Sequence, residues 1–187
     1  TRADFVEVVR RFRELGLVLH PTFVAFTPWI TSQGYLELLE AVRGLDLVEN
    51  VPPVQLAIRL LVPAGSRLLE LPEVRALVAP FDESVLIHPW AHPAPRVDLL
   101  LAEVEAMVRD AAARGESRTI VFERAWEIAE RALREGGGDL APAPAGAMRL
   151  AVRADARTAP GDEPLAPHVA REPKRPPIPF LTEPWYC

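Results

Sequence analysis

The chain has 187 residues, a formal net charge of −5 and a hydrophobic content of 49%, which is enough for one globular domain with an appendage. Its mildly acidic charge argues against a nucleic-acid partner, and no apolar run approaches the roughly 18 residues that a membrane span needs. The single cysteine excludes an internal disulfide and indicates a reducing, cytoplasmic compartment.

The first element is expected to be an amphipathic helix that is followed at once by a strand. Asp4 is a candidate N-cap and Gly16 a candidate C-terminal stop. Between them, apolar side chains recur at helical spacing at Phe5, Val8, Val9 and Phe12. Residues 17–19 and 22–26 are almost all apolar, β-branched or aromatic, which is typical of a strand buried on both faces.

A second helix and a second strand are expected next. Thr31 or Ser32 is a candidate N-cap, the apolar positions continue to residue 42, and Gly44 is expected to end the helix. Residues 54–62 form another apolar run, which the turn at 63–66 ends. This alternation of helix and strand predicts an α/β fold with βα units on a parallel sheet.

Three further helices are predicted before the pattern dissolves. A short one begins at Pro72, and another covers residues 120–133 with Ser117 as its N-cap. The longest covers residues 97–114 and ends at Gly115, and its apolar stripe is Val97, Leu100, Leu101, Val104, Met107, Val108 and Ala111. From residue 139 onward Ala, Pro, Arg and Asp follow no period, and half of the 20 prolines lie at or beyond position 138. This composition predicts a flexible linker, after which residues 179–187 are again apolar and aromatic.

Few residues suggest chemistry by their pattern. His20, His88 and His92 each precede a proline; the latter two have i, i+4 spacing, but Pro89 and Pro93 argue against a helix there, and zinc needs more ligands. A structural loop is therefore the favoured interpretation. The turn at 63–66 follows an apolar run, where ligands bind in parallel barrels, but from the residues alone an ordinary turn after a buried strand is the favoured interpretation. No nucleophile–base pair, phosphate-binding loop or paired carboxylates stand out.

Two features resemble the C-terminal portion of CUAEP/CCAEP-tail radical S-adenosylmethionine (SAM) proteins. The first is the ending Thr182-Glu183-Pro184-Trp185-Tyr186-Cys187, which is similar to the start of the tail that names the family. In that family a second cysteine or a selenocysteine follows, and then Ala-Glu-Pro. The second feature is the order and content of residues 19–29 (LHPTFVAFTPW), 63–66 (PAGS) and 88–93 (HPWAHP).

The resemblance implies a fold and cofactors. Residues 1–78 would be the last βα units of a partial (βα)6 barrel, 79–138 a loop and helical region, 139–178 the flexible linker and 179–187 a truncated tail motif. The family cleaves SAM reductively with a [4Fe-4S] cluster held by a Cys-x3-Cys-x2-Cys loop, and this chain has no such loop. None of these cofactors is expected to bind to this chain alone. By position, Val62, Pro63, Ala64 and Gly65 would meet the SAM adenine, and Cys187 would be a redox thiol.

Two functions follow as expectations. The chain is either the C-terminal part of a radical SAM enzyme, inactive alone and with an unknown substrate, or a stand-alone α/β binding module whose tail docks a partner. A lone thiol at Cys187 lacks the usual neighbouring redox partner, and the resemblance implies that position 188 is a selenocysteine whose UGA codon was read as a stop. A genuine terminus or a cloning boundary at Cys187 is the alternative.

Overall fold

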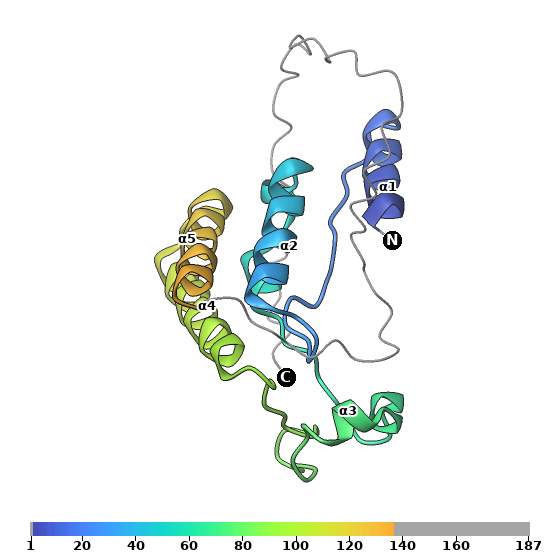
Figure 1. Ribbon diagram of the computed structural model, residues 1–187. Helices are drawn as coiled ribbons and strands as arrows, with labels where there is room; N and C mark the ends of the chain where they lie inside the picture. Colours follow the sequence, from blue (N-terminus) through green and yellow to red (C-terminus); the bar gives the residue numbers. More distant parts are fainter. Residues whose placement is uncertain (1, 137–187) are drawn as a thin grey trace, which may run out of the picture.

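A computed structural model describes residues 2–136, and these fold mainly as helices (Figure 1). The longer helices are α1 (Arg2–Glu14), α2 (Ser32–Gly44), α4 (Pro95–Arg114) and α5 (Arg118–Gly136). Shorter elements are the 3-10 helices η1 (Val48–Asn50), η2 (Pro53–Ala57) and η3 (Arg67–Glu70) and the single turn α3 (Pro72–Arg75). The linker predicted at 139–178 and the tail at 179–187 lie outside the described residues.

The predicted α/β fold, with βα units of a partial (βα)6 barrel, is wrong for the described residues. Residues 2–136 contain no strand, only isolated β-bridges. The two expected strands do meet side by side and parallel, but at a single bridge between Phe26 and Arg59. There the Phe26 amide donates to the Ile58 carbonyl at 2.9 Å, and the Leu60 amide donates to the Phe26 carbonyl at 2.8 Å.

The two apolar runs do not form a sheet because neither lies beside an extended segment long enough to pair with it. Pro52 and Pro53 begin a 3-10 turn, so η2 takes up the first half of the second expected strand. A parallel ladder is stable when it is part of a sheet whose two faces are covered. Here α2, α4 and α5 pack on one another instead, and residues 17–25 remain extended beside them (Figure 1).

The helices themselves largely confirm the sequence pattern. Thr31 is the N-cap of α2, and its Oγ1 accepts a hydrogen bond from the Gly34 amide at 2.9 Å. Gly16 and Gly115 both adopt positive φ, at 66° and 64°, and end α1 and α4 as predicted. Gly44 instead remains inside α2, whose C-cap is Leu45. On α4 the predicted apolar stripe is buried, with Met107 partly so.

One hydrophobic core holds α2, α4 and α5 together. Its largest fully buried side chains are Tyr35, Phe26 and Phe122, and the Tyr35 and Phe26 rings lie 4.8 Å apart. The Tyr35 hydroxyl donates to the Leu56 carbonyl at 3.0 Å, which ties η2 to the core. The core thus joins helices from residues 1–78 with helices from residues 79–138, the two regions that the resemblance distinguishes.

The first helix is attached more loosely than the other long helices. Figure 1 shows α1 apart from the α2, α4 and α5 group. Val9 is its buried contact with the core, whereas Val8 of the predicted apolar stripe is exposed. Asp4, the expected N-cap, lies in the first turn because the helix begins at Arg2. Exposed apolar side chains continue beyond α1 at Leu15, Leu17, Val18 and Val24, here called the N-terminal apolar segment.

Residues 61–94 leave the helical core as an excursion and return to begin α4. The excursion contains η3, α3 and a loop held by the antiparallel bridges Val78–Trp90, Pro63–Ile87 and Asp82–Ile87. In Figure 1 it lies below the helical core. None of the helices in residues 2–136 combines the length and apolar character needed to cross a bilayer.

Candidate functional site

The turn predicted to meet a ligand is present and lies at the start of the excursion. The Ser66 amide donates to the Pro63 carbonyl at 3.1 Å, and Gly65 adopts φ +72°. Val62 is fully buried, and its carbonyl accepts the His88 amide at 2.7 Å. The Pro63–Gly65 stretch is exposed and has no hydrogen-bonding side chain. This stretch could therefore offer a ligand little besides the backbone amides of Ala64 and Gly65.

Each of the three histidines that precede a proline lies within hydrogen-bonding distance of a backbone carbonyl. The Nδ1 atoms of His20 and His88 lie 3.1 and 3.0 Å from the carbonyl oxygens of Asn50 and Ala79. The Nδ1 atom of His92 accepts the Ala94 amide at 2.9 Å, while its buried Nε2 has no partner among the described residues. Residues 2–136 contain no group of three or more His, Cys, Asp or Glu side chains that could hold a metal ion.

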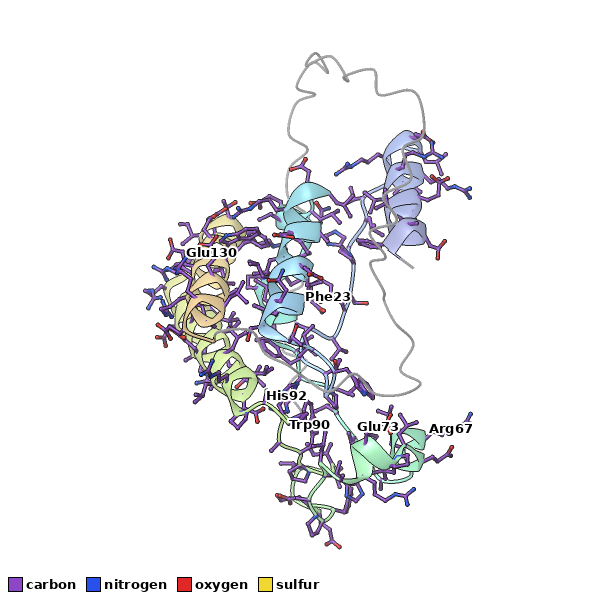
Figure 2. The ribbon with its side chains drawn as sticks, in the orientation of Figure 1. Phe23, Arg67, Glu73, Trp90, His92 and Glu130 are labelled. Carbon is purple, nitrogen blue, oxygen red and sulfur yellow. The ribbon has the colours of Figure 1, made fainter. Side chains whose placement is uncertain are left out.

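Arg59 is the centre of a polar cluster that joins the excursion to the helical core. Its Nη1 donates to the Asp98 carboxylate at 2.7 Å, and its Nη2 donates to the Trp90 carbonyl. The guanidinium carbon also lies 3.7 Å from the centre of the Trp90 ring, a cation–π contact. The second Asp98 oxygen accepts the His92 amide at 2.8 Å. Figure 2 shows Trp90 and His92 where the excursion returns toward α4.

The sequence patterns did not indicate this cluster, because Arg59 and Asp98 are 39 residues apart in the chain. A signal was nevertheless present: Arg59 is the one charged residue in the apolar run 54–62. A charge within a buried run is expected to have a partner. These contacts tie residues 59, 90 and 98 together, so the cluster works as a structural joint.

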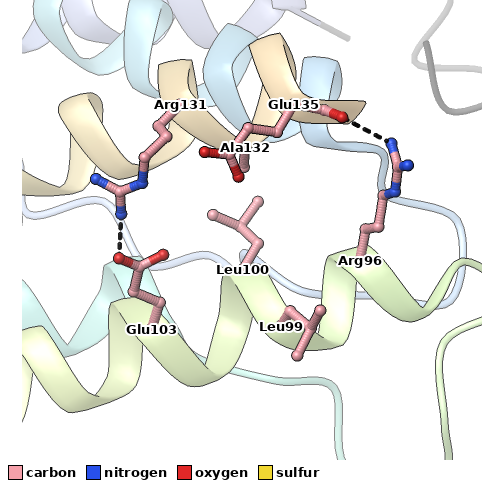
Figure 3. A pocket seen from close by; sticks show the side chains of 7 residues that line it. All are labelled: Arg96, Leu99, Leu100, Glu103, Arg131, Ala132 and Glu135. Atoms are coloured by element: carbon pink, nitrogen blue, oxygen red, sulfur yellow. Dashed lines mark hydrogen bonds and ion pairs between the residues drawn. The ribbon is translucent and has the colours of Figure 1, made fainter. Parts of the chain in front are cut away.

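A cleft of about 310 Å³ lies between α4 and α5 (Figure 3). Ion pairs and hydrogen bonds span it: Arg131 donates to the Glu103 carboxylate, and Arg96 donates to the Glu135 backbone carbonyl at 3.3 Å. The floor is Leu100 and Ala132. Because the two arginines are already satisfied by partners across the cleft, it resembles an ordinary helix–helix seam.

A larger concavity of about 680 Å³ lies between η2, α4 and the start of α5, and we name it the η2–α4 groove. This volume is in the range of pockets that hold ligands. Its apolar lining is Pro52, Pro53, Val54, Ala57, Ile58, Val108, Ala112 and Val121. Three charged residues, Glu105, Arg109 and Glu116, also line it.

Two of these three charged residues differ in how they are paired. The Glu116 carboxylate binds both Arg114 at 2.7 Å and Arg124 at 2.6 Å, and the hydrogen bond from Arg114 is the main cause of its lowered pKa. Arg109 forms no ion pair with any of residues 2–136. Glu105 likewise forms no ion pair with residues 2–136, so the groove combines an apolar floor with two carboxylates and one cation. No signal in the local sequence reveals the groove, because its walls are about 50 residues apart.

Comparison with known proteins identifies no relative: no protein-family model, curated protein or solved structure matches this chain.

Proposed function

We propose that this chain is the C-terminal portion of a radical SAM protein of the CUAEP/CCAEP-tail type. The observation that carries the proposal is the ending Thr182–Cys187. The content of residues 19–29, 63–66 and 88–93, and their order along the chain, support it. The described residues would then act as a helical support beside a catalytic centre that other parts of the protein hold. The substrate and the reaction are outside the proposal.

The residues present do not fit the family's iron–sulfur cluster. A [4Fe-4S] cluster takes several thiolates, and this chain has one cysteine. Residues 2–136 hold no alternative ligand group. The cluster ligands would therefore have to come from elsewhere, and no catalytic step is derived for this chain.

The SAM contact expected at residues 62–65 is retained only as a backbone contact. Val62 points into the protein interior and its carbonyl is already paired with His88. Proline has no amide hydrogen, so Ala64 and Gly65 are the two donors that an adenine could meet. The remaining SAM contacts would also come from outside this chain.

The coding sequence that precedes Thr1 tests the proposal. We expect an in-frame Cys-x3-Cys-x2-Cys motif upstream, and the protein encoded by that whole frame should release 5′-deoxyadenosine from SAM when its cluster is reduced. An in-frame stop codon before such a motif, or a reconstituted protein that leaves SAM intact, would contradict the proposal.

A stand-alone interaction module is the second candidate, although it would be helical and not α/β as expected. The exposed N-terminal apolar segment favours it, because contiguous apolar surface often marks a contact with another molecule. A start codon directly before Thr1 would favour this candidate over the first.

A further inference from the structure

We infer that the η2–α4 groove is the docking site for the chain's own C-terminal segment, residues 178–186, with an ion pair between Arg109 and Glu183. The inference is independent of the radical SAM proposal. It rests on the composition of the groove, on the chemistry of residues 178–186 and on the length of chain between them.

Part of the groove is exposed apolar surface that another segment could bury. Pro52, Pro53 and Val54 form one wall, and Val54 has 51% of its surface exposed. Val108 and Val121, which belong to the core, form part of the opposite wall. Val108 and Val121 are already buried, so the apolar surface that a cover would remove from water, at about 25 cal/mol per Å², lies mainly on the Val54 side.

The C-terminal segment has matching chemistry. Residues 178–186 read Ile-Pro-Phe-Leu-Thr-Glu-Pro-Trp-Tyr, and five of them are large apolar or aromatic side chains separated by prolines and polar residues. Prolines restrict the unbound segment, so less conformational entropy is lost on docking. Flat proline and aliphatic walls are suitable surfaces for the rings of Trp185 and Tyr186.

Beside the carboxylates of Glu105 and Glu116, the groove offers one positive charge, Arg109. Glu183 is the single acidic residue of the segment, and Arg109 is the groove cation without an ion pair among the described residues. The preceding stretch carries Arg171, Lys174 and Arg175 against one acidic residue, Glu172. The net charge of −5 lies on residues 1–138, because acidic and basic side chains balance beyond them. A basic stretch would therefore be drawn toward the acidic body.

The chain is long enough to make the contact. The described part of the chain ends with α5, whose last turn lies beside the start of α4 because Arg96 contacts Glu135. Arg109 lies about 20 Å further along α4 at the usual helical rise. A coil with the length of residues 137–177 has a mean span of about 35 Å. The groove is thus within reach of the same molecule.

The single cysteine provides a site-specific test in the full-length chain. A nitroxide attached to Cys187 should broaden the backbone amide signals of residues 52–58 and 105–112, measured against the same sample after the label is reduced. Broadening centred on another surface, such as the N-terminal apolar segment, or no localised broadening, would overturn the inference.

Matched variants identify the contacts. Val54→Glu places a charge in the groove and should abolish the broadening, whereas Leu99→Glu, at an exposed α4 position outside the groove, should leave it unchanged. Arg109→Glu should weaken the broadening, and the double variant Arg109→Glu/Glu183→Arg should restore it. Broadening that persists in both groove variants would overturn the inference.

A mixing experiment establishes that the contact is within one molecule. Labelled chains without isotope enrichment are mixed with isotope-enriched Cys187→Ser chains, so that only contacts between molecules broaden signals. The expected result is no broadening at the groove. Broadening there would identify a second copy as the occupant and would overturn the inference.

Discussion

At the scale of single residues, Arg59 links segments that are far apart in the chain. It lies in an apolar run and contacts Trp90 and Asp98, 31 and 39 residues further on. Its side chain is 24% exposed and that of Asp98 is 31% exposed, so the ion pair is partly shielded from water. Such a pair contributes more to stability than a fully exposed one. If one partner is removed, the other is left as an uncompensated charge that water only partly solvates.

Replacing Arg59 with methionine should lower the free energy of unfolding by about 2 kcal/mol, since both the ion pair and the cation–π contact disappear. Hydrogen exchange should accelerate mainly in residues 79–92, which the joint anchors. Arg67→Met is the matched control, because the Arg67 side chain is 91% exposed and its ion pair with Glu70 is long, at 3.6 Å. Equal effects of the two substitutions in a urea titration would contradict the role of the joint.

Tyr35 is the buried titratable group at the centre of the core. Burial raises the pKa of its phenol above the ordinary value of 10.0, because the charged form would lose its solvation. The unfolded chain ionises this group near pH 10, while the folded chain does not. The stabilisation due to the neutral phenol is therefore complete below pH 10 and is lost as the pH rises above it.

Tyr35→Phe should cost about 1 kcal/mol at neutral pH, because the Leu56 carbonyl loses its hydrogen bond. Above pH 10 the variant should lose stability less steeply than the parent chain, since it has no phenol at this position to ionise. Urea titrations at both pH values measure the difference. Parallel pH profiles for the two proteins would show that Tyr35 does not govern alkaline unfolding.

At the scale of elements, two glycines near helix ends have different physical roles. Gly115 is the C-cap of α4 and has φ +64°, a left-handed conformation that lets the chain turn toward α5. Its amide donates to the Ala112 carbonyl at 3.1 Å. Gly44 is the last residue of α2, and no positive φ is present there. In both places a Cβ atom would meet nothing within 4 Å, so backbone conformation alone separates them.

Gly115→Ala should destabilise the protein by about 1 kcal/mol, because an L residue is strained at positive φ. Gly44→Ala should be neutral or stabilising by up to about 1 kcal/mol, because alanine favours the helical state. Thermal unfolding of the two variants beside the parent chain tests the contrast. A destabilised Gly44→Ala chain would show that this glycine is also required by its conformation.

At the scale of the whole molecule, the main feature is the uneven distribution of apolar surface. The side chains of the core among α2, α4 and α5 are buried, whereas Leu15 and Leu17 of the N-terminal apolar segment are 72% and 54% exposed. Exposed apolar side chains of this kind favour association with other molecules.

Replacing Leu15, Leu17 and Val18 together with lysine should reduce the binding of a hydrophobic dye and slow aggregation, because these side chains contribute exposed surface and little core contact. The free energy of unfolding should stay nearly unchanged. Ile120→Lys, at an isolated exposed position on α5, is the control and should alter dye binding much less. Unchanged dye binding in the triple variant would place the apolar surface elsewhere.

The sequence by itself determined the longer helices and several of their ends. The stripe on α4, the Thr31 cap of α2 and the stops at Gly16 and Gly115 are all local patterns. A helix satisfies its backbone hydrogen bonds within one segment, so its residues carry most of the information that is needed. For the same reason the turn at 63–66 was predictable from four residues.

Only the tertiary structure decided that residues 17–26 and 54–62 are not strands. Their composition suits a buried strand, but a strand forms its backbone hydrogen bonds with another segment, and these two meet at one bridge. The joint at Arg59 and the η2–α4 groove likewise bring together residues about 30 to 70 positions apart. Packing of α2, α4 and α5 sets those distances, and periodicity within a segment carries no information about its partners.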